Sequence, residues 1–463
     1  MFNNQKGTIT PALLIITAAF VAAIYGILII LSLQINFSNR QVASEEALAI
    51  AEAGINYYSW HLSKAPTDYT SDTGIHTFID PQGQEIGEFN LEITPPETGS
   101  AAVTIRSTGK TYDYPSITRT IKARYGEPAL SQYTFFQNAS SWYGPETVVY
   151  GDIFSNNGIR MDGTNYGRVM SAKETYKCGT ETGCFPPDWR PGVWGSGGDQ
   201  SLWTFPVSSI DFDSISLDFN EMKSGAINDG LYLENSDEFG YHLVFSADGS
   251  FSLYRVLATN YYNAYRVPGN GLGAEGAGGC RKRYEKITDE EYIGSHNTGD
   301  TPIIFAEDHL WIEGTVDGRV TIAAVGFPLA SREMNIRIPN NLVYEQYDDS
   351  DSLGLVAQND ILISRDIPTD FRIDGALVAQ KGAIMRFGYL SECGSDTANA
   401  IRNSMIVRGS LSSYFKATWN YGTDPLLSGF NSIELQYDSD LSGNPPVYFP
   451  TSGTPGILSW TEE

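Results

Sequence analysis

The hydropathy of this chain changes sharply near its start, where a short polar segment gives way to an uncharged, almost wholly apolar run from Pro11 to Leu33. As an α-helix this run reaches roughly 35 Å, at about 1.5 Å per residue, which is enough to cross the hydrocarbon core of a bilayer. It passes directly into Gln34-Ile35-Asn36-Phe37, without the small-residue cleavage site that ends a secretory signal. We therefore expect a single membrane anchor that stays attached.

The helical pattern continues beyond this apolar run. No proline occurs between Pro11 and Pro66. Apolar residues recur there at three- and four-residue spacing, namely at Leu48, Ala51, Ile55, Tyr58 and Leu62. We expect one long helix over residues 8–64, with its transmembrane part at about 11–33.

The charges on either side of the apolar run favour an orientation with the N-terminus inside. Lys6 and the terminal amine lie on the short side, whereas Glu45, Glu46 and Glu52 follow on the long side. We predict a single-pass protein of the inner or cytoplasmic membrane, N-in, with everything after about Arg40 outside the cytoplasm.

The leader Gln5-Lys6-Gly7, the apolar run and the segment Ala49-Ile50-Ala51-Glu52-Ala53-Gly54-Ile55 form one pattern. This pattern resembles the N-terminal domain of PilX-type minor pilins and the large K-type minor pseudopilin of type II secretion. The resemblance covers about the first 64 residues. It implies that residues 1–7 are a leader peptide, which a prepilin peptidase removes after Gly7 to leave Thr8 as the mature N-terminus.

The sequence departs from the major pilins at one informative position. Major pilins carry a glutamate five residues into the mature chain, where this chain has Ala12. The K-type pseudopilin also lacks that glutamate and caps the filament tip, so the resemblance implies a tip position here. The alternative is an ordinary signal-anchored surface protein. Thr8 favours this alternative, because mature pilins usually begin with an aromatic residue.

Composition indicates a β-type body outside the cytoplasm. The 463 residues include 46 Gly, 27 Tyr and 22 Phe but only 18% charged residues, which suggests more than one domain with ample aromatic mass for a core. The formal net charge of −25 makes nucleic acid a poor partner, because phosphate binding needs a basic face.

Alternating strands follow the helix. Residues 86–93, 103–106 and 117–123 alternate apolar and polar positions, which predicts a β meander within 65–130. Four later segments then share an apolar-x-Gly-x-apolar core centred on Gly151, Gly314, Gly375 and Gly409.

One pair of segments repeats at a fixed offset of 22 residues, since Leu355-Val356-Ala357-Gln358 recurs as Leu377-Val378-Ala379-Gln380. Short strands at such a period are typical of stacked solenoid rungs. We predict a right-handed β-helix or solenoid built from residues 131–185 and 301–420. A β-sandwich is the alternative.

Residues 186–300 have a different pattern and are predicted to be an α+β insertion. An amphipathic helix is expected over 213–228, and a hairpin of 241–246 and 251–256 around Asp248-Gly249. Together with the C-terminal segment 421–463, this part resembles the ectodomains of large PilX-like proteins from small uncultivated bacteria, for which the resemblance implies no chemistry.

Candidate chemistry is sparse. The five histidines are far apart in sequence, and none forms a pair at metal-ligand spacing. The fingerprint-like stretch 271–276 has no strand before it and is expected to be a loop. Paired acids such as Asp211 and Asp213 could serve a glycosidase, but acids are abundant throughout and favour a solvated face. We nominate no catalytic residue.

Two further features bear on sites. Asp438, Asp440 and Ser442 resemble the start of a calcium-binding loop, although the twelfth position of that loop holds Phe449 rather than glutamate. Calcium is therefore a candidate ligand, and a polar turn is the alternative.

Cysteines occur only in the exported part, which suits two disulfides in an oxidising compartment. Three pairings are open for Cys178, Cys184, Cys280 and Cys393. The short Cys178–Cys184 loop is the most economical of them.

Taken together, these observations predict a mainly β, membrane-anchored and non-enzymatic minor pilin or pseudopilin of a type IV pilus or type II secretion-like filament. Its partners would be the membrane, other pilins, the assembly machinery and prepilin peptidase. A surface or polysaccharide ligand is expected for an adhesive head. The alternative from another class is a membrane-tethered β-helix enzyme that acts on polysaccharide.

Overall fold

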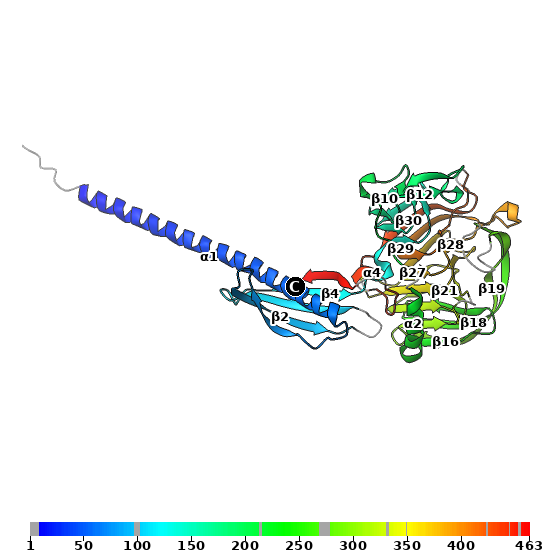
Figure 1. Ribbon diagram of the computed structural model, residues 1–463, viewed down its shortest axis with the longest axis horizontal. Helices are drawn as coiled ribbons and strands as arrows, with labels where there is room; N and C mark the ends of the chain where they lie inside the picture. Colours follow the sequence, from blue (N-terminus) through cyan, green and yellow to red (C-terminus); the bar gives the residue numbers. More distant parts are fainter. Residues whose placement is uncertain are drawn as a thin grey trace, which may run out of the picture. The chain divides into compact units, whose positions relative to one another are not determined.

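The computed structural model describes residues 9–96, 102–212, 215–267, 278–329, 333–348, 350–422, 425–443, 445–451 and 455–463. The chain divides into two compact units. The small unit holds the N-terminal residues as far as Pro96 together with Ala102–Gly126 and Gly456–Glu463, and the second unit, here called the head, holds Glu127–Pro455. The fold is mainly β with one long N-terminal helix, as the sequence predicts (Figure 1).

The small unit consists of one helix and, among its described residues, a five-stranded sheet in the order β1-β2-β3-β4-β31. Neighbouring strands pair antiparallel. The elements are α1 Ile9–Lys64, β1 Gly74–Ile79, β2 Glu85–Thr94, β3 Val103–Thr111, β4 Thr118–Gly126 and β31 Gly456–Glu462. The predicted meander strands correspond to β2, β3 and β4, whereas β1 and β31 were not predicted.

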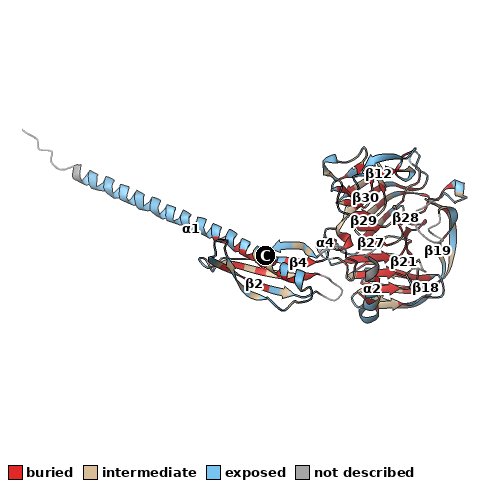
Figure 2. Ribbon diagram, in the orientation of Figure 1, coloured by how far each residue is buried: buried red, intermediate tan, exposed pale blue. Residues whose placement is uncertain are grey.

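Helix α1 has two halves with opposite surroundings. Residues 11–42 are exposed along their whole length although most of them are apolar. From Ala43 onward one face is buried on the sheet, through Ala47, Ile50 and Ala51 in particular. Figure 2 shows this change of burial along the helix. By length and composition α1 is able to cross a membrane, as expected for the anchor.

Small residues let the second half of α1 approach the sheet closely. A Cβ on Gly109 of β3 would collide with the backbone of Ala47 and Ala51, and a Cβ on Gly54 would lie 2.8 Å from the Phe89 ring. The Ala-Glu-Ala-Gly-Ile segment is therefore a packing surface, in which Ala51, Gly54 and Ile55 face the sheet while Glu52 faces solvent.

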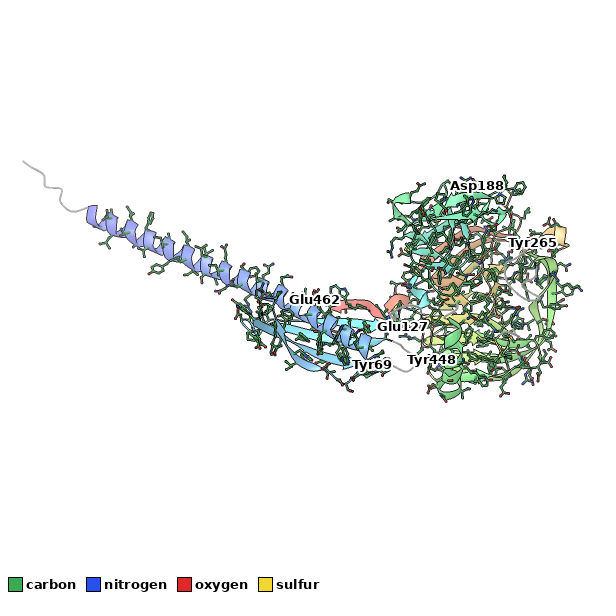
Figure 3. All side chains as sticks on the ribbon, in the orientation of Figure 1. Tyr69, Glu127, Asp188, Tyr265, Tyr448 and Glu462 are labelled. Atoms are coloured by element: carbon green, nitrogen blue, oxygen red, sulfur yellow. A yellow bond between two sulfur atoms is a disulfide. The ribbon has the colours of Figure 1, made fainter. Side chains whose placement is uncertain are left out.

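The C-terminal strand β31 returns to the small unit. It pairs antiparallel with β4, for example Trp460 with Ala123. An ion pair between Arg119 of β4 and Glu462 of β31 joins the same two strands, and Figure 3 labels Glu462. The head is thus inserted in the chain between two neighbouring strands of one sheet.

Nearly all strands of the head join one sheet, which is 21-stranded among the described residues. The elements of the head are, in chain order, η1 Leu130–Gln132, β5 Phe135–Gln137, β6 Ser141–Tyr143, β7 Thr147–Tyr150, β8 Ile153–Ser155, β9 Ile159–Met161, β10 Thr164–Asn165, β11 Val169–Ser171, β12 Thr175–Cys178, η2 Thr180–Thr182, β13 Asp188–Pro191, β14 Val193–Trp194, η3 Gln200–Leu202, β15 Trp203–Thr204, α2 Ile215–Asp229, β16 Leu231–Leu233, β17 Gly240–Phe245, β18 Ser250–Arg266, β19 Gly279–Asn297, β20 Ile303–Ala306, β21 Leu310–Val316, β22 Arg319–Ala324, β23 Ile336–Ile338, β24 Leu342–Tyr344, β25 Ser352–Ala357, β26 Ile361–Ile363, β27 Asp370–Ala379, β28 Ile384–Arg386, η4 Ser391–Cys393, β29 Ile401–Ser413, β30 Gly429–Tyr437 and α4 Asp440–Gly443.

Parallel strands from successive turns of the chain stack on one another in register. One row runs β16-β20-β22-β25-β27-β29-β5-β8-β11-β15. Strands from the early part of the head therefore extend the stack formed by the late part, and β15 and β16, which lie within the predicted insertion, form the two ends of this row. The handedness of the turns and their closure into a solenoid stay predictions.

The predicted register of the repeat is confirmed. Val356 pairs with Val378 between β25 and β27, Leu355 pairs with Leu377, and Val356 and Val378 are fully buried. Because side chains alternate across a strand, the leucines face one core cluster and the valines the opposite one.

The glycines of the four apolar-x-Gly-x-apolar segments lie where the chain passes from one row of strands to the next. In β29, residues before Gly409 pair with β30 and residues after it pair with β5. Their φ values are +129° at Gly151, +114° at Gly314, +141° at Gly375 and +142° at Gly409, a region that L side chains rarely adopt. Gly375 and Gly409 also pair directly, and a Cβ on Gly409 would collide with the Gly375 carbonyl oxygen.

The predicted helix and hairpin of the insertion are present, as α2 and the pair β17–β18. Helix α2 packs Phe219, Met222 and Ala226 into the same core cluster as Val356 and Val378. Strand β18 also pairs with β19 in a long antiparallel hairpin. A buried ion pair of 2.7 Å between Arg266 and Asp360 ties this hairpin to the stack.

Candidate functional site

The predicted processing residues Gly7 and Thr8 lie outside the described residues. The four cysteines form two disulfides, Cys178–Cys184 and Cys280–Cys393, with Cα atoms 5.6 Å and 5.2 Å apart. This pairing is one of the three that the sequence analysis left open, and it contains the short-range disulfide Cys178–Cys184 that the sequence favoured. The second disulfide joins β19 to η4 and closes a long stretch of chain.

The structure gives no support to calcium at the Asp438 segment. The side chain of Asp438 is buried and lies 3.4 Å from Arg408, and residues Asp440–Gly443 form the short helix α4. The side chain of Ser442 lies outside the described part. Among the described residues no group of three or more His, Cys, Asp or Glu side chains has metal-binding geometry. Calcium binding here stays a prediction.

The head contains a large cleft, with a volume of about 1500 Å³. Its walls come from β5, β6 and β9, from the turn at η2, and from the segment between β29 and β30. The parallel pairing of β5 with β29 brings these distant parts of the sequence together. We call this cavity the aromatic cleft after its main lining residues, which are Trp142, Tyr143, Tyr265, Trp419, Tyr421 and Phe430.

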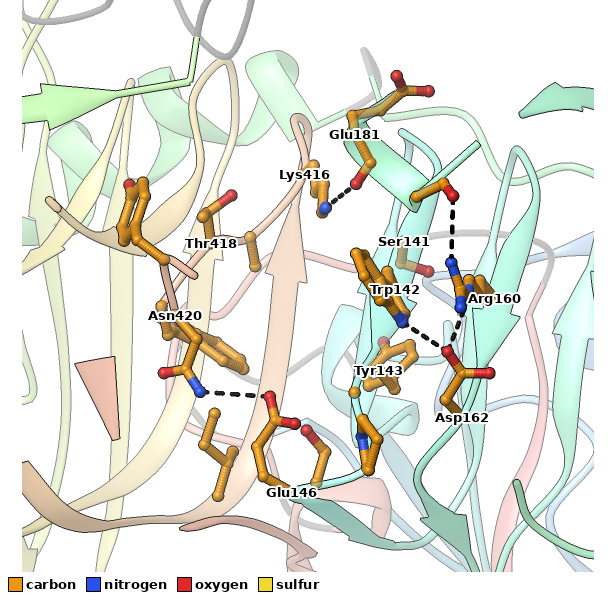
Figure 4. Close-up of a pocket in the computed structure, with 18 of the residues that line it drawn as sticks. Ser141, Trp142, Tyr143, Glu146, Arg160, Asp162, Glu181, Lys416, Thr418 and Asn420 are labelled. Atoms are coloured by element: carbon orange, nitrogen blue, oxygen red, sulfur yellow. Dashed lines mark hydrogen bonds and ion pairs between the residues drawn. The ribbon is translucent and has the colours of Figure 1, made fainter. Parts of the chain in front are cut away.

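A cluster of paired groups forms one wall of the aromatic cleft. Arg160 donates to Asp162 at 2.7 Å, and the Trp142 indole N–H donates to the same carboxylate oxygen at 2.9 Å (Figure 4). The guanidinium lies 4.3 Å from the centre of the Trp142 ring and 4.9 Å from that of Trp194. Desolvation raises the pKa of Asp162, but hydrogen bonds from Ser196 and Trp142 and the charge of Arg160 outweigh it, so the pKa lies below its ordinary value.

Two further charged groups face the aromatic cleft. The Lys416 ammonium donates to the backbone carbonyl of Glu181, and Asn420 donates to the Glu146 carboxylate at 3.2 Å (Figure 4). Burial lowers the pKa of Lys416 to about 8; Glu181 opposes this shift and Arg160 adds to it. The carboxylates of the cleft therefore already accept hydrogen bonds from the protein itself.

Several buried polar atoms of the aromatic cleft have no hydrogen-bond partner among the described residues. They include the indole nitrogen of Trp419, the hydroxyl of Thr418 and the amide oxygen of Gln137. These residues are only 8%, 9% and 2% exposed. Buried polar groups are normally paired, so these atoms in the wall of the cleft lack the partners that such groups usually have, although each is shielded from water.

A smaller cavity of about 330 Å³ lies beside His242 of β17. The two ring nitrogens of His242 lie 2.9 Å from Glu290 and 3.0 Å from Glu313. Burial lowers the pKa of His242, but hydrogen bonds to Glu313 and Glu290 and their charges outweigh burial and raise it above its ordinary value. This arrangement stabilises the doubly protonated imidazolium.

Sequence reasoning found neither cavity. Trp142 and Arg160 are brought together by the pairing of β6 with β9, and the stacking of β5 on β29 brings the segment of Trp419 to them. No local spacing records that contact. His242 and its two glutamates likewise come from three strands, so the histidine carries no motif in the sequence.

The geometry defines a mainly β protein with one N-terminal helix long and apolar enough to cross a membrane and a head that carries an aromatic cleft. No family model matches the chain, and no curated protein matches it. Among solved structures it is similar to the competence-associated pilin ComZ from Thermus thermophilus, at 12% sequence identity and a TM-score of 0.31, over 91% of this chain and 97% of that one.

Proposed function

We propose that this protein is a minor pilin-like subunit that joins a type IV pilus or a type II secretion-like filament through α1 and presents the head outside the cell. The observation that carries the proposal is the division of α1 into a bare apolar half and a half packed on the sheet of the small unit. A bare apolar helix requires lipid before assembly and apolar neighbours after it. Filament packing of such helices supplies those neighbours.

Two features of the chain support a position at the filament tip. Position 12 of α1 is alanine, so the mature chain has no carboxylate there to neutralise the terminal amine of a neighbouring subunit. The head, Glu127–Pro455, is large for a subunit that repeats at the spacing of a helical bundle. At the tip one copy suffices.

The proposal includes a non-enzymatic role. Asp162 is held by Arg160, Trp142 and Ser196, and Glu146 accepts from Asn420, so each carboxylate of the aromatic cleft has a structural partner. A membrane-tethered enzyme that acts on polysaccharide is the alternative, and the same cleft would then have to shorten a bound chain.

Gold labelling of an epitope on the head tests the position in the filament. We expect few gold particles per filament, all of them at the ends. A separate experiment, cell fractionation, tests the anchor: replacing Leu28 in the apolar half by arginine should reduce the share of the protein found in the membrane fraction, because arginine costs about 3 kcal/mol at the bilayer centre. Gly26→Ala is the matched control, because a Cβ there meets nothing within 4 Å. Labelling along the whole shaft at the density of a major subunit would overturn the tip position.

A further inference from the structure

The aromatic cleft has the size and composition of a binding site for an extended ligand. Its volume of about 1500 Å³ exceeds the roughly 300–1000 Å³ of pockets that hold one drug-sized molecule. Aromatic rings line it, together with neutral polar groups from Gln137, Thr418 and Asn420. Such a lining combines apolar surface with groups that fix the orientation of a ligand.

The unpartnered atoms restrict what the ligand is. The indole N–H of Trp419 is a donor, the amide oxygen of Gln137 is an acceptor, and the hydroxyl of Thr418 is both. A ligand that satisfies all three must itself carry groups that donate and accept. Hydroxyl groups do both.

The charges of the aromatic cleft argue against an ionic ligand. Arg160 is paired with Asp162 and lies against Trp142, and Lys416 donates to the Glu181 carbonyl. A polyanion would meet Glu146 and the strongly acidic chain, whose formal charge is −25. The lining holds two cations, Arg160 and Lys416, and three carboxylates, Glu146, Asp162 and Glu181, so its charges nearly balance. The cleft therefore suits an uncharged ligand.

We propose that the aromatic cleft binds a neutral oligosaccharide. The C–H faces of sugar rings pack on aromatic side chains, and their hydroxyls pair with Trp419, Thr418 and Gln137. Phe135, which also lines the cleft, stacks on Trp419 with ring centroids 5.6 Å apart and restricts the position of that ring. This proposal rests on the proposed function in one respect, because it requires the head to lie outside the cytoplasm, where polysaccharide is met.

The test titrates the full chain, held in phospholipid nanodiscs free of glycoside detergents, with neutral hexasaccharides of glucose, mannose and N-acetylglucosamine. Tryptophan fluorescence and calorimetry report binding. We expect saturable binding of at least one hexasaccharide and about tenfold weaker binding by Thr418→Val, the loss of one hydrogen bond. The melting temperature of Thr418→Val should stay equal or rise, because a buried unpaired hydroxyl is removed.

Matched controls separate binding from structure. Thr164→Val in β10 and Trp189→Phe in β13 replace the same residue types at exposed positions outside the cleft and should leave the affinity unchanged. Trp419→Phe keeps an aromatic ring against Phe135 but loses the indole N–H, so it should weaken binding.

Three outcomes would overturn the proposal. They are no saturable binding by any neutral hexasaccharide, an affinity unaffected by Thr418→Val and Trp419→Phe, or tighter binding of a hexagalacturonate than of every neutral chain. Each of these would leave the anchoring and filament proposal standing, since the titration does not depend on assembly. Shortening of a bound hexasaccharide would instead support the ligand class and overturn the non-enzymatic role.

Discussion

Individual glycines determine where elements of this protein come close together. In the head, glycines at positive φ let a strand pass from one row of the stack to the next. In the small unit, Gly109 has a different role, because it admits the backbone of α1 at Ala47 and Ala51. The two kinds of glycine respond differently to substitution, which makes the packing testable.

Gly109→Ala should destabilise the small unit by about 1–3 kcal/mol, the usual penalty for overpacking. The added Cβ collides with backbone atoms of α1, which do not rotate away as a flexible side chain does. A urea titration of the full chain in detergent micelles, followed by circular dichroism, measures this change in the free energy of unfolding.

The matched control is Gly456→Ala in β31 of the same sheet. A Cβ at Gly456 meets nothing within 4 Å, so only the reduced freedom of the unfolded chain remains, which stabilises by about 0.4–1 kcal/mol. Equal effects of the two substitutions would contradict the close packing of α1 on β3.

The pH dependence of stability reports on His242. Its pKa is raised in the folded head, so the protonated ring stabilises the head fully below the unfolded pKa of about 6.5, and this contribution is lost as pH rises through the folded pKa. We expect the free energy of unfolding to fall above about pH 6.5 more steeply in the natural chain than in His242→Gln.

Chemical denaturation at a series of pH values, with both proteins in the same micelles, gives the difference between the two curves. Titrating groups that do not contact His242 cancel in that difference. Glu313, whose pKa the hydrogen bond to His242 lowers, contributes only in the acid range, so the two curves are compared above about pH 6. A natural chain that loses no stability relative to His242→Gln as the pH rises from about 6 to 8 would contradict a raised pKa of His242.

At the scale of elements, the head is held by the register of parallel strands. Val356 and Val378 pair directly and lie in one buried cluster with α2. Replacing either by Asp should cost about 3–5 kcal/mol, because the charge is buried without a compensating partner. Thermal denaturation of each variant measures this loss.

Ile401→Asp in β29 is the control, since Ile401 is 42% exposed and belongs to the strand that pairs with β27. It should change stability by no more than about 0.5 kcal/mol, as substitutions at exposed positions usually do. A head that tolerates Val378→Asp as well as it tolerates Ile401→Asp would refute the register.

Local patterns predicted the elements that depend on local signals. The apolar run and its helical spacing predicted α1, and the 22-residue repeat predicted the pairing of Leu355 with Leu377. The predicted helix over 213–228 nearly coincides with α2. These signals arise from the periodicity of side chains, which is visible within a single segment of the sequence.

Long-range pairings left no such record. Strand β31 joins β4 from the far end of the chain, and β5 stacks on β29 although Phe135 and Leu411 are far apart in sequence. The aromatic cleft depends on the second of these pairings, so its residues could not be grouped from the sequence. For the same reason spacing could not assign Cys280 to Cys393.

On the scale of the whole molecule, the head is an insertion in the chain of the small unit. The chain leaves the sheet of that unit at Gly126 and rejoins it at Gly456, beside the strand that it left. Two chain connections therefore link the head to the unit that carries α1. This arrangement suits a subunit whose anchor is fixed in a filament and whose head meets the surroundings.

If α1 is a pilin-like anchor, a prepilin peptidase cuts the chain after Gly7, and the position of the mature N-terminus reports that cut. Mass spectrometry of the membrane-extracted chain, from cells with and without an active prepilin peptidase, measures that terminus. The account predicts that the chain begins at Thr8 when the peptidase is present and retains Met1 or its initiator-processed form when it is absent. An uncut leader in cells that have the peptidase would contradict the account, and so would a cut beyond Leu33.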